Sequence, residues 1–475
     1  MKNWPCNRNK NLPNVKIGTV TTTNGFIVNV GKKSYALNYP SITWNKLPFS
    51  LKNKIAESLS FIFTRHIPFL KKIKLNYSFA PPLIQSLFIH GLIHSIPELV
   101  IDEEPNFSKT TSEIIKLLYN SESYISFASN ISPKLEKNHK TYPAIANMLF
   151  TFGKDSLLTF SLLKEIGIKV IPYFISEPFS QKEVKIKTLL IKQFKKELKY
   201  DIKIVNNTMG FLRQSGSEMW GWDMLLTGYL IMLIPYIYSE KAGNFFISNE
   251  QSTNDWEIDK ENYIVNPTFE QSSLWTQNLN NLFYFFSLDT HISSLIEPLH
   301  ELGITYILHR RYPNIAKFQL SCDLEKFSLK NNRWCENCGE CARIYIFLLA
   351  IGIDPQNIGF TKSMLAPDFK KNYAIFSEKN LDSINKYNTF CKFSEELFAL
   401  YICYKRGVKG AIIELFKDSY LEIAEKYRNE LFRKYLSIYK SRTNSPDLIK
   451  RVLPIFNEEI SNFKKEVTVL FSARV

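Results

Sequence analysis

The sequence predicts an α/β protein built on a doubly wound parallel sheet, with an N-terminal α+β region, a four-cysteine metal site and a helical C-terminal region. Residues 142–319 alternate apolar strand-like runs with amphipathic helix-like runs, the pattern of a parallel sheet covered on both faces. Four cysteines gather within residues 322–341, and charged side chains alternate with apolar ones further on. We therefore expect four parts, at residues 1–140, 141–320, 321–365 and 366–475.

Length and composition are typical of a folded cytoplasmic protein. The chain has 475 residues, of which 45% are hydrophobic and 22% charged, which is enough for a sizeable core. The N-terminus lacks the apolar stretch of a signal peptide, so we do not expect export. The most hydrophobic run, Met224–Tyr238, is shorter than the ~20 residues that cross a bilayer. We expect it to form a buried helix, with no membrane insertion.

The charge balance favours anionic partners. The net charge is +15 and the pI about 9.2, which suits nucleotides, RNA or an acidic surface alike. Most lysines are scattered in helix-like stretches such as 192–199, the pattern of solvated helix faces. Nucleic acid is therefore an open but less favoured partner than a small anionic substrate.

The N-terminal region starts with strand signals and continues with helical ones. Short strand-like runs at Lys16–Thr21 and Phe26–Val30 flank Asn24-Gly25, a strong hairpin turn signal. From Leu51 to Leu118 the apolar spacing is helical, and Ser123–His139 is polar enough to predict a loop.

Two histidines stand out in this region. His90 and His94 lie four residues apart on one predicted helix, a spacing that can bind a metal ion. No carboxylate or third ligand accompanies them. We expect them to be packed or capping residues.

The central region predicts the strands and helices of the parallel sheet in order. Ile145–Phe152 is a buried strand, Asp155–Ile166 an amphipathic helix that Gly167 ends, and Ile168–Ile175 a second strand. The next elements are expected as a helix at Lys182–Leu198, a strand at Asp201–Val205, a helix at Trp220–Tyr238 and a strand at Asn244–Ser248.

The turn after the first strand carries Gly153-Lys154-Asp155-Ser156. It opens a helix at the carboxyl end of a strand, where backbone N–H groups and the positive helix end face the ligand crevice. Lys154 adds a cation and Ser156 a hydroxyl. The Walker A spacing is absent, because only one glycine precedes the lysine. The turn predicts a different phosphate site, or else a strand–helix turn without a ligand.

A second polar segment follows the strand Asn244–Ser248. In a doubly wound sheet, Asn249 and Glu250 would face the same crevice as Gly153. They could hold a ribose, a metal ion or a second substrate there. A plain polar loop is the alternative.

The cysteine cluster has the spacing C-x12-C-x2-C-x2-C, formed by Cys322, Cys335, Cys338 and Cys341. Four thiolates make a closed tetrahedral set of the kind that structural zinc prefers, and Gly339 would let backbone N–H groups turn toward the sulfurs. An iron–sulfur cluster also uses closely spaced cysteines and is the less favoured alternative. Seven cysteines, four of them clustered, favour metal binding over disulfides.

The C-terminal region predicts helices. In Ser394–Arg406 and Ile412–Tyr439, lysine and glutamate alternate with apolar positions. We expect an amphipathic bundle that packs on the core and exposes its lysines to solvent.

The segment Thr151–Ser156 resembles the pyrophosphate-binding PP-loop of the N-type ATP pyrophosphatases, usually written Ser-Gly-Gly-x-Asp-Ser. Enzymes of that group cleave ATP between the α and β phosphates and adenylate a substrate. The resemblance implies that Thr151, Phe152, Gly153, Lys154, Asp155 and Ser156, together with Asn249, bind ATP. Thr151 and Phe152 depart from the pattern. A bulky residue at the first glycine limits the approach of the backbone to the phosphates.

A PP-loop followed by four cysteines is also similar to the 7-cyano-7-deazaguanine synthase group. The UDP-N-acetylmuramoyl-L-alanyl-L-glutamate epimerase family is a nearer match, with a Phe-Gly-Lys-Asp/Glu-Ser loop, an Asn-Glu-x-Ser segment, a Ser-Cys-Asn/Asp motif and a Trp-Cys-x-x-Cys-x-x-Cys-Ala run. These lie here at Phe152–Ser156, Asn249–Ser252, Ser321–Asp323 and Trp334–Ala342. Phe390–Glu396 is similar to a further family stretch, Phe-Glu-Cys-x-Gly-x-x-Glu-Glu, except at Lys392 and Phe393. The likeness covers about residues 145–400.

This resemblance implies an ATP-dependent isomerase of peptidoglycan precursor synthesis. It would convert the terminal L-Glu of UDP-MurNAc-L-Ala-L-Glu to D-Glu, with Mg²⁺ bridging the phosphates and ATP giving AMP and pyrophosphate. Lys154 would stabilise the leaving pyrophosphate, and Asp155 and Glu250 are candidate metal ligands and catalytic residues. For the group that moves the α-proton, Glu250, Asp323 and Cys391 are the candidates.

Two other functions stay open. One is an enzyme like the deazaguanine synthases that modifies a nucleobase, a tRNA or a protein. The other is a catalytically silent nucleotide-binding or defence-type module, which the atypical Thr151 and Phe152 suggest.

Overall fold

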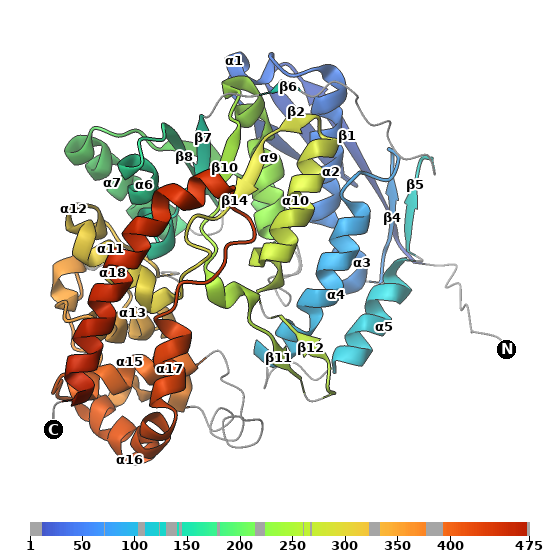
Figure 1. Ribbon diagram of the computed structural model, residues 1–475. Helices are drawn as coiled ribbons and strands as arrows, with labels where there is room; N and C mark the ends of the chain where they lie inside the picture. Colours follow the sequence, from blue (N-terminus) through green and yellow to red (C-terminus); the bar gives the residue numbers. More distant parts are fainter. Residues whose placement is uncertain are drawn as a thin grey trace.

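The structure is a computed structural model (Figure 1). It describes residues 12–70, 72–102, 110–122, 124–129, 140–141, 145–177, 181–213, 224–259, 261–266, 268–322, 333–376 and 393–472. Within these ranges the strands form two five-stranded sheets and two short two-stranded pairs.

The central sheet is parallel throughout, as the sequence predicts. Its strands are β7 (Ala146–Leu149), β8 (Val170–Ser176), β9 (Lys203–Asn206), β10 (Asn244–Phe246) and β14 (His291–Ser293). Their order is β14-β10-β7-β8-β9, and each neighbouring pair is parallel. The chain leaves β7 in one direction and returns to its other side with β10. The ligand crevice of such a sheet is expected at the carboxyl ends of these two strands.

Helices cover both faces of this sheet (Figure 1). α6 (Lys154–Glu165) and α7 (Gln181–Leu198) pack on one face and share a core with Met148 and Phe174. α9 (Leu225–Glu240) and α10 (Ser273–Phe285) pack on the other and share a core with Tyr173 and Phe245. Because neighbouring side chains of a strand point to opposite faces, Tyr173 and Phe174 lie in different cores.

The N-terminal region is a mixed sheet with helices. The strands are β1 (Asn14–Thr22), β2 (Gly25–Val30), β3 (Lys33–Asn38), β4 (Lys74–Tyr77) and β5 (Ile125–Phe127), in the order β3-β2-β1-β4-β5. The expected hairpin at Asn24-Gly25 joins β1 to β2. A side chain at Gly25 would collide with the backbone of Leu37 on β3, since an added Cβ lies 2.0 Å from its oxygen.

Two N-terminal strands correct the sequence prediction. Lys74–Tyr77 falls inside the range predicted as helical, and Ile125–Phe127 falls inside the predicted loop. Both pair in parallel, β4 with β1 and β5 with β4. The helices of this region are α1 (Ser41–Trp44), α2 (Phe49–Thr64), α3 (Ile67–Leu70), α4 (Gln85–Asp102) and α5 (Thr111–Glu122).

The most apolar helix of the sequence, α9, is buried as expected. An uninterrupted run from Leu230 to Ile237 is buried against α2 and the sheet. The predicted start at Trp220 lies outside the described residues. Among the described residues, no helix is long and apolar enough to cross a membrane.

The C-terminal half is helical. Its helices are α11 (Glu301–Arg311), α12 (Pro313–Ala316), α13 (Gly339–Ala350), α15 (Ser394–Lys405), α16 (Ala411–Lys426), α17 (Arg428–Tyr435) and α18 (Pro446–Ser472). They extend the core that α6 and α7 begin. α15 departs from the predicted amphipathic pattern, because every residue from Ser394 to Cys403 is buried among its neighbours. α16 keeps the expected polar face.

Short elements complete the described chain. They are α8 (Gly210–Arg213) and the two-stranded pairs β6 (Lys140–Thr141) with β13 (Leu288–Asp289) and β11 (Glu257–Ile258) with β12 (Ile264–Val265).

Candidate functional site

The loop after β7 has the shape that the sequence predicts. α6 begins at Lys154, and its N-cap is Gly153, which has no side chain to cap the first turn. Phe152 has φ 64°, a left-handed conformation that glycine adopts easily and phenylalanine rarely. Its ring is fully buried between Phe150 and Phe194. The bulk of Phe152 therefore lies in the core and does not fill the crevice above the loop, contrary to the expectation from the sequence.

Three hydroxyl groups surround the N-terminus of α6. Thr151 Oγ1 accepts a hydrogen bond from Gly153 N at 3.3 Å, and Ser321 Oγ accepts one from Lys154 N at 3.4 Å. Ser156 Oγ lies between Thr151 N at 3.2 Å and Gly153 O at 3.1 Å. The two bonds to the helix N–H groups exceed the usual 2.9–3.0 Å, so a stronger acceptor such as a phosphate oxygen could replace them.

Lys154 is almost completely buried and stands among carboxylates. Its Nζ lies 2.9 Å from Asp155 Oδ2 and 3.0 Å from Glu301 Oε2. Burial lowers the pKa of Lys154, but the charges of Asp155, Glu301 and Glu250 outweigh it and raise the pKa above its usual value. Lys154 is therefore a permanent cation at the edge of the loop.

Glu250 lies at the carboxyl end of β10, the position predicted for it. It is 7% exposed, and its Oε2 accepts a hydrogen bond of 2.7 Å from Ser252 N at the start of a 3₁₀ turn, Gln251–Asn254. Burial and the charge of Glu301 raise the pKa of Glu250 to about 8. The carboxyl group therefore keeps its proton at neutral pH.

Asn249 forms hydrogen bonds at the same carboxyl-end edge of the sheet. Its Nδ2 donates to Gln271 O at 2.7 Å, and its carbonyl oxygen accepts a bond of 2.6 Å from Ser294 Oγ. The first contact uses one N–H of the side-chain amide and the second is made by the backbone carbonyl, so the proposed ATP-binding role of Asn249 stays a prediction. Asp323 and Cys391, the other proposed proton carriers, lie outside the described residues.

Three charged residues of this site have no role assigned from the sequence: Glu301 and Arg343 are absent from the sequence prediction, and Glu395 is named only as part of the stretch Phe390–Glu396. Glu301 starts α11 and bridges Lys154 to Arg343, whose Nη1 lies 3.2 Å from Glu301 Oε1. Glu395, on α15, accepts a bond of 2.6 Å from Leu302 N. A signal for Glu301 exists, since it follows the fifth strand as Glu250 follows β10, but that strand is too short to be recognised. Arg343 lies two residues beyond the last clustered cysteine.

The carboxyl groups of this cluster differ in their pKa. Burial raises the pKa of Glu395 well above its usual value, and the negative charges of Glu301 and Glu250 raise it further. Glu301 stays ionised: burial opposes this, but Arg343 and Lys154 hold its pKa low. Lys154 contacts Asp155 and Glu301, and Arg343 contacts Glu301 and Glu340. Deprotonation would leave a surplus of carboxylate oxygens, the ligands that Mg²⁺ prefers.

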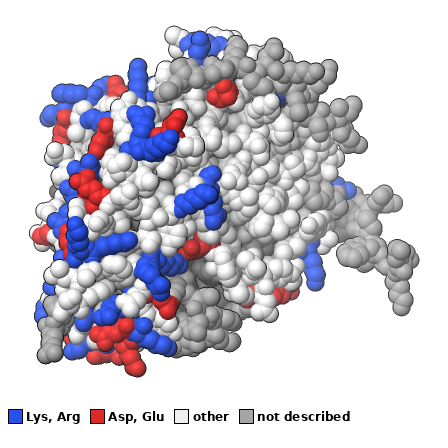
Figure 2. Space-filling view, in the orientation of Figure 1, with Lys and Arg blue, Asp and Glu red and all other residues white. Residues whose placement is uncertain are grey.

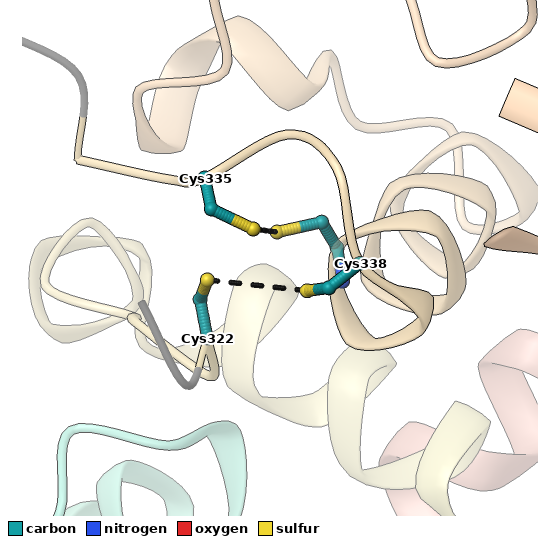
Figure 3. Close-up of side chains that lie close together, drawn as sticks. Cys322, Cys335 and Cys338 are labelled. Atoms are coloured by element: carbon teal, nitrogen blue, oxygen red, sulfur yellow. Dashed lines mark hydrogen bonds between the residues drawn. The ribbon is translucent and has the colours of Figure 1, made fainter. Parts of the chain in front are cut away.

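The four cysteines predicted to bind metal come together. Their sulfur atoms all lie within 4.8 Å of one another, with Sγ–Sγ distances of 4.0 Å for Cys322–Cys338 and 3.6 Å for Cys335–Cys341. Figure 3 shows Cys322, Cys335 and Cys338 pointing toward a common centre from two separate segments. Bonds of ~2.3 Å in a tetrahedron separate sulfurs by about 3.8 Å. The set could therefore hold a metal ion such as zinc.

The turn between these cysteines is made differently from the prediction. Glu336, and not Gly339, has a positive φ, 50°. Its carboxylate is 1% exposed and accepts hydrogen bonds from the backbone and hydroxyl of Thr361, which fixes the strained turn. Cys338 is the N-cap of α13 and accepts the N–H of Cys341 at 3.4 Å. The sulfur of Cys338 thus caps the start of α13, and the N–H of Cys341 stabilises that sulfur in return.

His90 and His94 pack on aromatic rings, in agreement with the sequence prediction. The ring of His94 stacks on Phe269 with centroids 4.2 Å apart, and His90 lies against Trp275. Burial lowers the pKa of His94, and the neighbouring His90 lowers it further.

Fold and site together define an α/β protein with a strand–helix loop at the switch point of a parallel sheet and a four-cysteine cluster. Comparison of the chain with known proteins finds no match among protein-family models, curated proteins or solved structures.

Proposed function

We propose that the protein binds ATP across the crevice between β7 and β10 and cleaves it to AMP and pyrophosphate while activating a carboxylate. The observation that carries this proposal is the N-terminus of α6, which opens at the switch point with a glycine, a buried lysine and three hydroxyl groups. A helix N-terminus with these groups suits the phosphates of a nucleotide.

The chemistry follows from the charges at the loop. A carboxylate oxygen of the acceptor attacks the α-phosphorus, the bond to the bridging oxygen breaks, and pyrophosphate leaves with the electron pair. The N–H groups of α6 and the ammonium of Lys154 stabilise the negative charge that grows on this leaving group. Asp155 would supply an oxygen ligand for Mg²⁺, which when bound would neutralise phosphate charge.

For the acceptor we propose the terminal L-Glu of UDP-MurNAc-L-Ala-L-Glu, which the protein would convert to D-Glu. The four motifs shared with the epimerase family support this choice. An α-proton beside a carboxylate is very weakly acidic, because its loss creates a second negative charge. Adenylation removes the first charge, so positioned acid–base groups suffice to take the α-proton and return one to the opposite face. Water then hydrolyses the acyl adenylate, which releases AMP and the carboxylate of D-Glu. We assign one of the acid–base roles to Glu250, whose carboxyl group stands at the crevice edge with a raised pKa.

The same residues serve a second acceptor class equally well. An enzyme like the deazaguanine synthases, acting on a nucleobase or a tRNA, would use the same loop. On the face shown in Figure 2, however, Lys and Arg are interspersed with Asp and Glu. A continuous basic stripe on that face would have favoured a nucleic acid. We therefore place the small anionic acceptor first.

At the four cysteines we propose structural zinc. The sulfur spacing fits a single tetrahedral ion, and zinc prefers four thiolates in a closed site. Zinc close to one equivalent by elemental analysis is the expected result. Iron, with a brown colour, would show that the less favoured cluster occupies the site.

The test of the proposed reaction combines two products. With ATP, Mg²⁺ and UDP-MurNAc-L-Ala-L-Glu, we expect pyrophosphate release that depends on the acceptor, and D-Glu after acid hydrolysis. Lys154→Ala should lower the rate by about 10²–10³-fold, because the leaving group loses its cation. Lys164→Ala, an exposed lysine on the same helix, is the matched control.

The possible outcomes separate the functions. Pyrophosphate release without D-Glu would point to another acceptor, such as a nucleobase. ATP binding without turnover would indicate the silent nucleotide-binding module. Absence of ATP binding in the metal-loaded protein would exclude both enzymes.

A further inference from the structure

The segment that leads into the cysteine centre also forms a wall of the loop. Leu320 N donates to Phe152 O at 2.8 Å, and the next residue, Ser321, accepts the N–H of Lys154. Cys322 follows directly as a member of the cysteine set. No residue separates the contact with the loop from the metal ligand, so displacement of Cys322 would displace the hydroxyl of Ser321.

A second connection runs from the other end of the cysteine set. Cys341 lies in the first turn of α13, and Arg343 follows two residues later. The guanidinium of Arg343 contacts Glu301, which in turn contacts Lys154. Both segments that supply the cysteines therefore connect to the loop. Ser321 contacts the backbone of Lys154, and Arg343 is linked to the ammonium of Lys154 through Glu301.

The hydroxyl of Ser321 is placed to bind whatever anion occupies the loop. Its oxygen lies 3.4 Å from Lys154 N, and a Cβ added at Gly153 would lie 3.7 Å from it. In the structure the oxygen accepts a hydrogen bond from Lys154 N. Because a hydroxyl both accepts and donates, the same group can turn its O–H toward an anion that takes over that N–H. Thr151 and Ser156 supply hydroxyls around the same N-terminus.

We propose that Ser321 is an anion-binding residue of the loop and that metal at the cysteines holds it in place, so that metal and nucleotide bind cooperatively. A shared metal ion would bond the sulfur of Cys322 to those of Cys335, Cys338 and Cys341 and so hold segment 320–322 more firmly than the Sγ–Sγ contact with Cys338 does. Linkage requires the reverse effect also: an anion in the loop must raise the affinity for metal, and we expect this to appear as slower release of metal. Only the identity of the anion rests on the proposed function.

The first experiment needs no nucleotide. Amide hydrogen exchange is measured on peptides covering 150–157 and 25–30, in the metal-loaded protein, after chelation, and in metal-loaded Ser321→Ala. We expect faster exchange at 150–157 in both altered forms and no change at 25–30, which is β2 of the N-terminal sheet. Ser321→Thr, which keeps the hydroxyl, should restore protection, and Ser363→Ala, whose hydroxyl accepts from Leu365 N, is the control serine. Unchanged exchange at 150–157 in metal-loaded Ser321→Ala would overturn the proposal. Because this variant is measured with metal bound, its result is informative even if chelation unfolds the wild type.

The second experiment measures the coupling itself. ATP affinity is compared between metal-loaded wild type and metal-loaded Ser321→Ala, and metal release to a coloured chelator is timed with and without ATP. Loss of a hydrogen bond to a charged oxygen weakens binding by about tenfold or more, and ATP should slow release in the wild type but much less in the variant. Equal affinities together with an ATP-independent release rate would overturn cooperative binding. If the metal-loaded wild type binds no ATP, the proposed function fails, whereas the exchange result still decides the role of Ser321.

Discussion

At the residue scale, Phe152 shows how one side chain can look incompatible with a site and yet fit it. The sequence places a large ring where the PP-loop has glycine. The backbone there is left-handed, as it would be for glycine, and the ring turns into the core between Phe150 and Phe194. A left-handed conformation costs a non-glycine residue about 1–2 kcal/mol, and burial of a phenylalanine offsets that by a similar or larger amount.

Glu250 gives a prediction at this scale. Its ordinary pKa is 4.5, and burial with the charge of Glu301 raises it to about 8 in the folded chain. Below pH 4.5 both states hold the proton. Between about 4.5 and 8 only the folded state holds it, so stability falls as pH rises, by up to ~1.4 kcal/mol per pH unit, and levels off above 8. Glu250→Gln removes this loss.

We therefore expect Glu250→Gln to gain melting temperature relative to the wild type as pH rises from 5 to 8.5. Thermal melts across this range measure the difference, and the amide can still bond Ser252. Glu458→Gln, an exposed carboxylate, should show no such trend. A difference between Glu250→Gln and wild type that is constant with pH would mean that Glu250 is ionised in the folded protein.

At the scale of elements, sequence patterns predicted the long segments and missed the short ones. The helices at 155–166 and 182–198 were predicted to within a residue or two, because their apolar positions repeat over several turns. β14 has only three residues, two of them polar, and gives no alternation to detect. Because β14 was not predicted, Glu301 was not recognised as a residue that follows a strand of the central sheet.

The residues of the candidate site also divide into those that a local sequence pattern identifies and those that it does not. The four cysteines carry their own spacing and were predicted completely. Arg343 lies just beyond a recognised motif and Glu395 inside one, but neither motif indicates a contact with the loop. They join the site because α13 and α15 pack behind the loop. A local pattern identifies residues that act together along the chain, whereas residues brought together by packing need the fold.

The segment between α17 and α18 supplies the prediction at this scale. Glu297, 3% exposed, fastens this segment to the end of the central sheet. Its carboxylate accepts bonds from Ser273, from the backbone of Arg442 and from both the backbone and hydroxyl of Thr443. Glu297→Gln turns an N–H group toward these donors. We expect a loss of roughly 2–3 kcal/mol of stability and faster amide exchange at 438–446.

The control for this prediction is again Glu458→Gln, whose ion pair with Arg311 is solvent-exposed and worth at most about 1 kcal/mol. Thermal melts give the stability and exchange of the peptide 438–446 gives the location. Normal protection of that peptide in Glu297→Gln would show that other contacts hold the segment.

At the scale of the whole molecule, the N-terminal region and the central sheet share one apolar core. Phe63 of α2 packs against Gly228 of α9, since a Cβ added at Gly228 would lie 3.4 Å from its ring. Tyr39 donates its hydroxyl to Met232 O at 3.1 Å. The division at residue 140 stays a prediction, but the core does not stop there: residues on both sides of it belong to the same buried cluster.

A chain that begins at residue 141 should therefore fail to fold as a stable unit. It would expose the buried side of α9 from Leu230 to Ile237, where the N-terminal helices now exclude water. We expect it to aggregate or to bind a hydrophobic dye, whereas a chain that begins at residue 12 should behave as the full protein. Phe63→Ala tests the same contact in the intact chain, with an expected loss of about 3–5 kcal/mol and a single cooperative melt. A monodisperse truncated chain that still binds metal would show instead that the central sheet is stable without the N-terminal region, and the shared core would then be a docking contact between two independent folds.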